Sequence, residues 1–177
     1  MKKILVIGGS NSKSSINTML ATYIASQITD AEVTTVNWEN LVLPLYSTDL
    51  EQAEGIPDVA IQFMKSIEKT DAIVLSLAEY NGMITSALKN LWDWTSRIDQ
   101  KIWSNKPMFL AATSPGGRGG IGALTAVINI MPHFGGNVIT DYSLPKFYQN
   151  FQDEKILDVE KQQELTEKIN LFTQAIH

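Results

Sequence analysis

Short apolar runs alternate with segments of helical periodicity along almost the whole chain. The apolar runs have the length of strands and are bounded by polar or glycine-containing turns. The expected strands are Lys3–Ile7, Glu32–Asn37, Ala72–Leu77, Pro107–Thr113 and Asn137–Tyr142. Between them, apolar residues recur at the helical period, which predicts helices with one buried face. The expected helices are Ser15–Ile28, Asp58–Lys69, Thr85–Arg97, Gly120–Met131 and Val159–Ala175, and Trp38–Pro57 is expected to be a loop.

Strands that alternate with helices in this way predict an α/β fold, with a five-stranded parallel sheet between two helical layers. Right-handed crossovers leave few topologies, and strand order 2-1-3-4-5, the flavodoxin-like order, is favoured. The almost continuous apolar run at 107–113 is typical of a strand covered on both faces. No internal repeat, linker or low-complexity tract is evident. We therefore expect residues 1–177 to form a single flavodoxin-like, three-layer α/β/α domain.

Composition and charge exclude several classes of function. Apolar residues make up 44% of the chain and the formal net charge is −5, with no basic face for nucleic acid. No apolar run approaches the roughly 20 residues of a membrane helix, and the first strand meets Gly8-Gly9 too early for a signal peptide. We therefore expect a cytoplasmic protein. The absence of cysteine excludes thiolate catalysis, and with only two histidines no transition-metal site is expected.

The loop after the first strand, residues 8–17, is rich in hydroxyl and amide groups and opens a helix. Unpaired N–H groups and the helix dipole attract anions at such a position. The glycine spacing matches neither a Walker A loop nor a dinucleotide fingerprint. The loop therefore suits a terminal phosphate monoester such as that of FMN. The alternative is a polar turn in which Ser14 or Ser15 serves only as N-cap.

Two further loops follow later strands. Residues 77–82, Leu-Ala-Glu-Tyr-Asn-Gly, offer a carboxylate, a ring and an amide, which suit a flavin; the alternative is an ordinary turn. Residues 114–120, Ser-Pro-Gly-Gly-Arg-Gly-Gly, permit close approach to a ligand or form a flexible loop. In order 2-1-3-4-5 the three strands are neighbours. The three loops should therefore meet at the carboxyl edge of the sheet, where ligands of open α/β sheets bind.

These motifs resemble the NADPH-dependent FMN reductase family, which includes flavodoxin-like quinone and azo-dye reductases. The resemblance runs from Ile4 to about Leu144 and is most specific at 79–82, followed by Leu88-Lys-Asn90 and Asp93-Trp94. It implies bound FMN, NADPH or NADH as reductant, and a quinone, azo compound, flavin or similar acceptor. The FMN-binding residues that it implies are Ser10, Ser12, Ser15, Ile16, Asn17, Glu79, Tyr80, Asn81, Gly82, Ser114, Gly116, Gly117 and Arg118.

Two positions depart from the family's pattern. Ser12 stands where an arginine is usual, and Ala78 stands where a proline usually precedes Glu-Tyr-Asn. The missing guanidinium removes a charge-assisted contact to phosphate, which Lys13 could replace only as a point charge. We expect these changes to preserve the fold and to weaken the binding of FMN.

Hydride transfer through a flavin depends on stacked rings and needs no protein acid or base, so no catalytic side chain is expected. Arg118 should lie near a nucleotide phosphate or the flavin edge, or be a solvated loop residue. Two competing functions remain open at this point. One is a flavodoxin-type electron carrier without NAD(P)H turnover, and the other is a degenerate domain that has lost FMN.

An aromatic-rich segment predicts a subunit contact. The segment holds more large apolar side chains than one buried helical face needs, namely Trp92, Trp94, Trp103, Ile98 and Ile102. Exposed apolar patches usually mark interfaces. The family resemblance agrees, because these enzymes commonly form homodimers or homotetramers.

Overall fold

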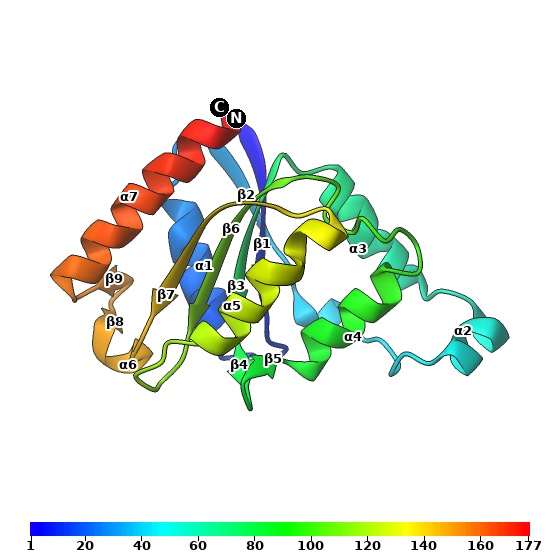
Figure 1. Cartoon of the computed structure of the whole chain (residues 1–177). Coiled ribbons are helices and arrows are strands. Elements are labelled where there is room, and N and C mark those ends of the chain that lie inside the picture. Colours follow the sequence, from blue (N-terminus) through cyan, green and yellow to red (C-terminus); the bar gives the residue numbers. More distant parts are fainter.

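The computed structural model describes all 177 residues and is built around a five-stranded parallel sheet (Figure 1). Its strands are β1 (Lys2–Gly8), β2 (Ala31–Thr35), β3 (Ala72–Leu77), β6 (Pro107–Thr113) and β7 (Asn137–Leu144). Their order is β2-β1-β3-β6-β7, and every neighbouring pair is parallel. The predicted fold class and strand order are therefore confirmed.

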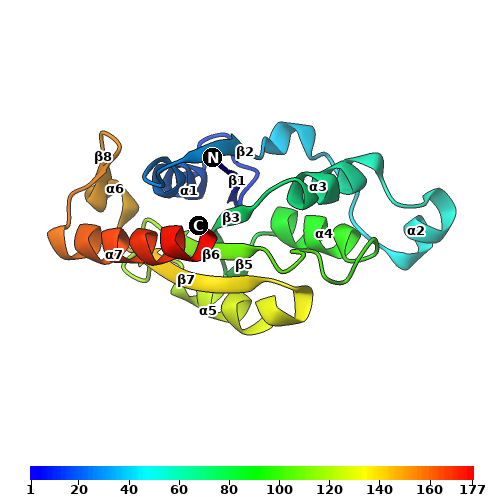
Figure 2. The ribbon, with the colours of Figure 1, turned by 90° about the horizontal axis from the view of Figure 1, so that it is seen from above.

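Helices cover both faces of the sheet (Figure 2). The first face carries α1 (Ile16–Ser26) and α7 (Val159–Ile176). The second face carries α3 (Asp58–Glu68), α4 (Ser86–Thr95) and α5 (Ile121–Ile130). The central strands supply both cores, because successive strand residues point to opposite faces. In β1, Ile4 and Val6 pack on the first face while Leu5 and Ile7 pack on the second.

Side-chain caps explain where several helices begin. The hydroxyl of Ser15 accepts the N–H of Thr18 at 3.1 Å and starts α1. The hydroxyl of Thr85 accepts the N–H of Leu88 at 3.2 Å and starts α4. These contacts satisfy N–H groups that have no partner in the first turn of a helix. Helix α5 differs, because its N-cap residue is Gly120, which has no side chain that could accept a hydrogen bond.

Several short elements were not expected from the sequence. The predicted loop 38–57 contains the turn η1 (Trp38–Asn40) and α2 (Thr48–Glu54), so that prediction was wrong for these residues. Helix α2 buries none of its residues and projects away from the sheet (Figures 1 and 2). The other unexpected elements are β4 (Glu79–Tyr80), β5 (Met83–Ile84), η2 (Met131–Phe134), α6 (Phe147–Asn150), β8 (Phe151–Gln152) and β9 (Lys155–Ile156). No helix is both long and apolar enough to cross a lipid bilayer.

The aromatic segment expected at an interface lies inside the chain. Trp92, Trp94 and Trp103 are 5%, 0% and 2% exposed, and Ile102 is fully buried. The rings of Trp92 and Trp103 meet edge to face, with centroids 5.6 Å apart, and the Trp94 indole N–H donates to a backbone carbonyl. Only Ile98 of the predicted patch is exposed. The prediction of an exposed patch was therefore wrong, because the three tryptophans and Ile102 are covered by other parts of the same chain.

Candidate functional site

The loops that follow β1, β3 and β6 meet at the carboxyl edge of the sheet, around the switch point between β1 and β3. An open cavity of about 220 Å³ lies between them. It is lined by Ser10, Ser12, Ser14, Ser15, Ile16, Asn17, Ala78, Glu79, Tyr80, Thr113, Ser114, Pro115 and Tyr148. Residues from all three predicted loops therefore share one cavity, as the strand order requires.

The first loop presents backbone donors that no protein atom satisfies. The N–H groups of Asn11, Lys13, Ser14, Ile16 and Asn17 make no hydrogen bond within the protein. Two of these groups open α1, where the helix dipole adds a partial positive charge. Successive free N–H groups at a helix N-terminus form a binding site for a phosphate.

Two serines add hydroxyl groups to this cup. Ser10 is 2% exposed, and its hydroxyl oxygen accepts the N–H of Ser12 at 3.2 Å, which leaves the hydroxyl hydrogen free to donate. Ser15 is the N-cap of α1. The two interpretations of this loop are therefore compatible, since capping by Ser15 holds the helix end that presents the free N–H groups.

The side chain of Asn17 connects the first loop to the sheet. Its side chain is 2% exposed and joins α1 to β3 and β6. The amide oxygen accepts the Ser76 hydroxyl at 2.8 Å and the Thr113 N–H at 3.0 Å, while the amide nitrogen donates to the Thr113 carbonyl at 3.2 Å. One amide hydrogen and the backbone N–H remain for a ligand. The main role of the Asn17 side chain is thus to hold the first loop in a fixed position relative to β3 and β6.

The first loop carries no free cation. The Lys13 ammonium pairs with Glu39 at 2.7 Å, and the two side chains are 87% and 60% exposed. Ser12 is exposed and uncharged. A phosphate in this cup would therefore be held chiefly by N–H and hydroxyl groups, because the one cation of the loop is exposed and shares a carboxylate.

The second loop is a β-hairpin in which β4 pairs antiparallel with β5. Its turn residues Asn81 and Gly82 have φ values of +54° and +82°. Two consecutive left-handed residues are typical of the type I′ turn that Asn-Gly favours. Tyr80 and Met83 flank the turn and are 55% and 57% exposed. The hairpin therefore presents a ring and a thioether to solvent beside the cavity.

Glu79 connects this hairpin to α5. Its carboxylate accepts the Ala123 N–H at 2.9 Å and so supplies the cap that α5 lacks. A Cβ atom at Gly122 would come within 2.8 Å of the same carboxylate. Glu79 thus stabilises the start of α5 through one carboxylate oxygen. The predicted contact of Glu79 with the flavin would have to come from its backbone or from the other carboxylate oxygen.

The third loop contains glycines of two kinds. A Cβ atom at Gly119 would lie 2.4 Å from the Ser143 hydroxyl, so the fold itself requires glycine there. Gly116 and Gly117 are different, because a Cβ atom at Gly117 meets nothing within 4 Å and one at Gly116 meets its nearest atom at 3.9 Å. Neither has a positive φ angle. The open space beside them permits the close approach of a ligand.

The other predicted residues lie around the cavity without lining it. Asn81, Gly82, Gly116, Gly117 and Arg118 occupy the hairpin turn and the third loop. Sequence reasoning missed five residues that do line the cavity, namely Ser14, Ala78, Thr113, Pro115 and Tyr148. Tyr148 comes from α6, which follows β7, and no periodic pattern marks so short a helix.

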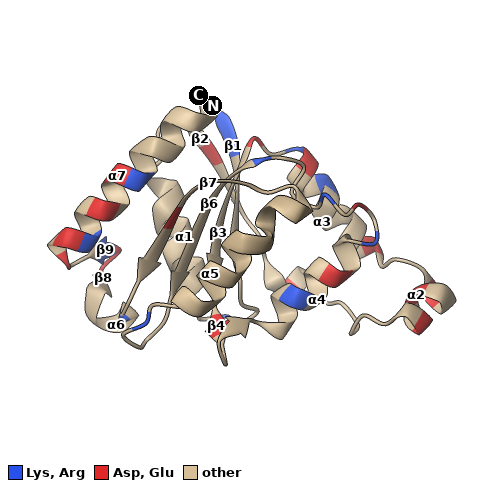
Figure 3. Cartoon of the chain, viewed as in Figure 1, with Lys and Arg blue, Asp and Glu red and all other residues tan.

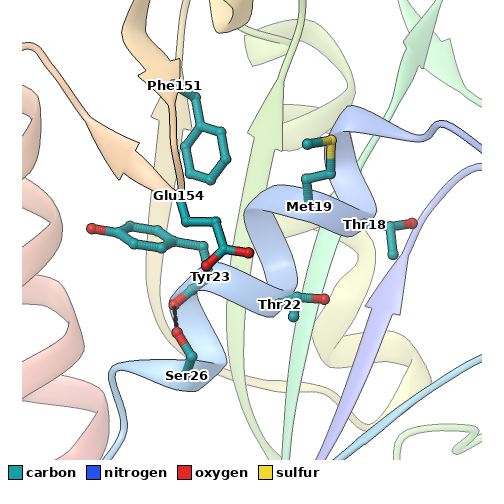
Figure 4. A pocket seen from close by; sticks show the side chains of 7 residues that line it. All are labelled: Thr18, Met19, Thr22, Tyr23, Ser26, Phe151 and Glu154. Atoms are coloured by element: carbon teal, nitrogen blue, oxygen red, sulfur yellow. Dashed lines mark hydrogen bonds between the residues drawn. The ribbon is translucent and has the colours of Figure 1, made fainter.

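A second cavity, of about 290 Å³, runs along the outer face of α1 (Figure 4). It is more apolar, with Met19, Tyr23 and Phe151 among its walls. The Tyr23 and Ser26 hydroxyls already donate to protein oxygens. Its lining includes none of the residues of the first loop whose backbone N–H groups are free. The cavity at the carboxyl edge therefore fits a phosphate-bearing cofactor better.

Comparisons with known proteins identify relatives of this chain. The family model described as NADPH-dependent FMN reductase matches residues 2–149. A quinone reductase of Pseudomonas putida is 36% identical over 125 residues, which span 70% of this chain and 66% of that relative. A quinone reductase of Escherichia coli K12 is 28% identical over 144 residues, which span 76% of this chain and 73% of that relative.

Solved structures point the same way. FerB, a flavoenzyme NAD(P)H:(acceptor) oxidoreductase from Paracoccus denitrificans, aligns with a TM-score of 0.78 at 26% identity and covers 99% of this chain and 97% of its own. A flavodoxin variant from Pseudomonas aeruginosa aligns at 0.55 and 14% identity, covers 98% of each chain, and supports the fold alone. The expected enzyme class, an FMN-dependent NAD(P)H oxidoreductase, is confirmed. Since the family model spans most of its length, the chain belongs to the NADPH-dependent FMN reductase family.

Proposed function

We propose that this chain uses NAD(P)H and bound FMN to reduce quinones or similar small acceptors. The observation that carries the proposal is the cup of unsatisfied N–H groups over residues 11–17, beside a loop whose open glycines adjoin the same cavity. The relatives named quinone reductase support the acceptor class.

The residues present fit FMN. A phosphate monoester matches the free N–H groups and the buried Ser10 hydroxyl. A planar ring system matches the space left by Gly116 and Gly117. The cavity is smaller than the roughly 300–1,000 Å³ of typical ligand sites, so it would hold the phosphate end rather than the whole cofactor.

When bound, FMN supplies the two-electron chemistry, and the protein supplies binding and orientation. The 11–17 loop would fix the phosphate, and the Asn17 bridge would keep that loop in register with β3 and β6. The Glu79 cap would hold the hairpin against α5. The exposed Tyr80 ring would leave a broad, permissive surface for flat acceptors.

We also propose that the chain self-associates and works in the cytoplasm. Val42 and Leu45 are 79% and 81% exposed and line a cavity that also reaches Asn11 of the phosphate loop. Exposed apolar residues next to a site support a homodimer or homotetramer. The need for NAD(P)H, an intracellular reductant, supports the location.

Absorption spectroscopy tests the proposal. The purified protein, loaded with FMN and kept free of oxygen, is mixed with NADPH or NADH and then with a benzoquinone. We expect the yellow colour to bleach with the nucleotide and to return with the quinone. A yellow protein that ignores both nucleotides would identify an electron carrier instead. A protein that takes up no FMN would identify a degenerate domain.

A further inference from the structure

The tyrosine hydroxyl groups that lack a protein partner are all found at one place. Three of the five tyrosines donate their hydroxyl hydrogen to a protein oxygen, namely Tyr23, Tyr46 and Tyr142. The other two, Tyr80 and Tyr148, have no such partner, and both line the cavity at the carboxyl edge. They are 55% and 65% exposed. The two free phenol groups therefore point to a ligand in this cavity, where a few polar groups would fix its orientation.

Backbone and ring contacts hold Tyr148 beside the cavity. The Phe147 N–H donates to the Ser114 carbonyl at 3.0 Å, which ties the start of α6 to the third loop. The Tyr148 ring meets the Phe147 ring edge to face, with centroids 5.6 Å apart, and Phe147 in turn stacks on Phe151 at 5.0 Å. Phe147 and Phe151 are 2% and 7% exposed. The Tyr148 ring is therefore supported by the core and left uncovered only toward the cavity and solvent.

Tyr148 lies on the side of the sheet that carries the phosphate cup. Phe147 is buried in the core on the α1 face, and Ile16, at the start of α1, packs against the same cluster. Ile16 and Tyr148 both line the cavity. Tyr80 belongs instead to the hairpin that is hydrogen-bonded to α5 on the opposite face. Of the two free phenol groups, Tyr148 is thus the one on the side of the 11–17 loop.

The cavity lacks a cation for the phosphate. No lysine or arginine lines it, and α6 carries no charged residue of its own (Figure 3). Ser12 stands where an arginine is usual in the family. A phenol O–H is a neutral donor, but its hydrogen bond to a charged phosphate oxygen is about twice as strong as one between neutral groups. An additional O–H donor therefore supplies part of the contact that the missing guanidinium would have made.

We propose that Tyr148 is a further FMN-binding residue, whose hydroxyl donates a hydrogen bond to the phosphate and whose ring covers the phosphate end of the cofactor. The inference deepens the proposed function and rests on it, because that function requires bound FMN. None of the motifs that carry the family resemblance includes Tyr148. A ring at this place also keeps water from the phosphate, which strengthens the hydrogen bonds of the cup.

Titration of the flavin-free protein with FMN and with riboflavin, followed by flavin fluorescence, tests the assignment in matched variants. Tyr148→Phe removes only the hydroxyl, so we expect the dissociation constant of FMN to rise about tenfold and that of riboflavin to change less than about twofold. Tyr148→Ala removes the ring as well, and it should weaken riboflavin about threefold and FMN about 30-fold. The control is Tyr23→Phe, which removes the hydroxyl of a tyrosine outside this cavity and should change each constant less than about twofold.

The ratio of the two dissociation constants separates a phosphate contact from a structural role. Equal losses for FMN and riboflavin in Tyr148→Phe, or no loss, would overturn the assignment. A loss of FMN affinity in Tyr80→Phe alone would also overturn it, because the phosphate contact would then belong to the hairpin. If the expected ratio is found but neither NADPH nor NADH reduces the FMN-loaded protein, the proposed function fails and the assignment stands. A wild type that takes up no FMN would overturn both.

Discussion

Replacing Asn17 with alanine tests whether this buried amide holds the carboxyl edge together. The substitution removes three hydrogen bonds, to the Ser76 hydroxyl and to the N–H and carbonyl of Thr113. Ser76 and Thr113 are 0% and 1% exposed, so water cannot simply replace the lost partner. Each bond contributes about 1 kcal/mol, and buried groups left unpaired cost more. We therefore expect Asn17→Ala to lower the free energy of unfolding by about 3 kcal/mol.

Urea unfolding of the FMN-free protein, followed by circular dichroism, measures this loss. In a chain of this length, a loss of that size would lower the melting temperature by roughly 6–12 °C. The matched control is Asn11→Ala, because Asn11 lies in the same loop, is exposed and makes no side-chain hydrogen bond. We expect the control to change stability by less than about 0.5 kcal/mol. A loss below about 1 kcal/mol for Asn17→Ala, with weakened FMN binding, would refute the bridging role.

Three further substitutions test other parts of the account. Glu79→Ala should lower the free energy of unfolding, measured in urea, by about 1 kcal/mol, because α5 loses its N-terminal cap. Glu79→Gln should lower it less, and equal losses for the two variants would argue against the cap. Gly117→Val should leave the FMN-free fold unchanged but weaken FMN binding at least about tenfold, and unaltered affinity in a fluorescence titration would contradict the site. Burial raises the pKa of Glu164, but hydrogen bonds from Lys161 and Lys168 outweigh it and lower the pKa below the usual 4.5. The charged carboxylate therefore stabilises the fold above pH 4.5, by less than about 1 kcal/mol because the site is partly exposed. This stabilisation is lost as the pH falls through the pKa of Glu164 in the folded state. The penalty of Glu164→Gln should vanish in acid, and a penalty that persists there would rule out the charged network.

The sheet could be predicted from the sequence because its strands are buried on both faces. Such strands form continuous apolar runs, and β3 and β6 have the bounds expected from those runs. Their order followed from general rules of connection, which also placed the three loops at one edge. The position of the site was thus available before any side-chain contact was known.

The hairpin and the roles of individual side chains were harder to predict. Strands of two residues have no periodicity, although Asn81-Gly82 is a strong signal for a hairpin turn. The cap formed by Glu79 joins residues 44 positions apart, and the Asn17 bridge joins residues 96 positions apart. Neither pairing is encoded in a local pattern.

The tryptophan-rich segment shows another limit of sequence reasoning. Its composition indicates large apolar side chains but not whether another part of the same chain covers them. Here Phe134 covers Trp92 edge to face at 5.0 Å, and the Pro44 carbonyl accepts the Trp94 indole N–H at 2.8 Å. The aromatic side chains of this segment are therefore buried by other residues of the same chain.

The central claim is that the loop at residues 10–17 is a phosphate cup for FMN. Titration of the flavin-free protein with FMN and with riboflavin, followed by flavin fluorescence, tests it most directly, because the two ligands differ only in the phosphate. The free N–H groups and the Ser10 hydroxyl predict that FMN binds at one site per chain, at least about 100-fold more tightly than riboflavin. Equal affinity for the two flavins would contradict the account, because the cup would then contribute nothing to binding.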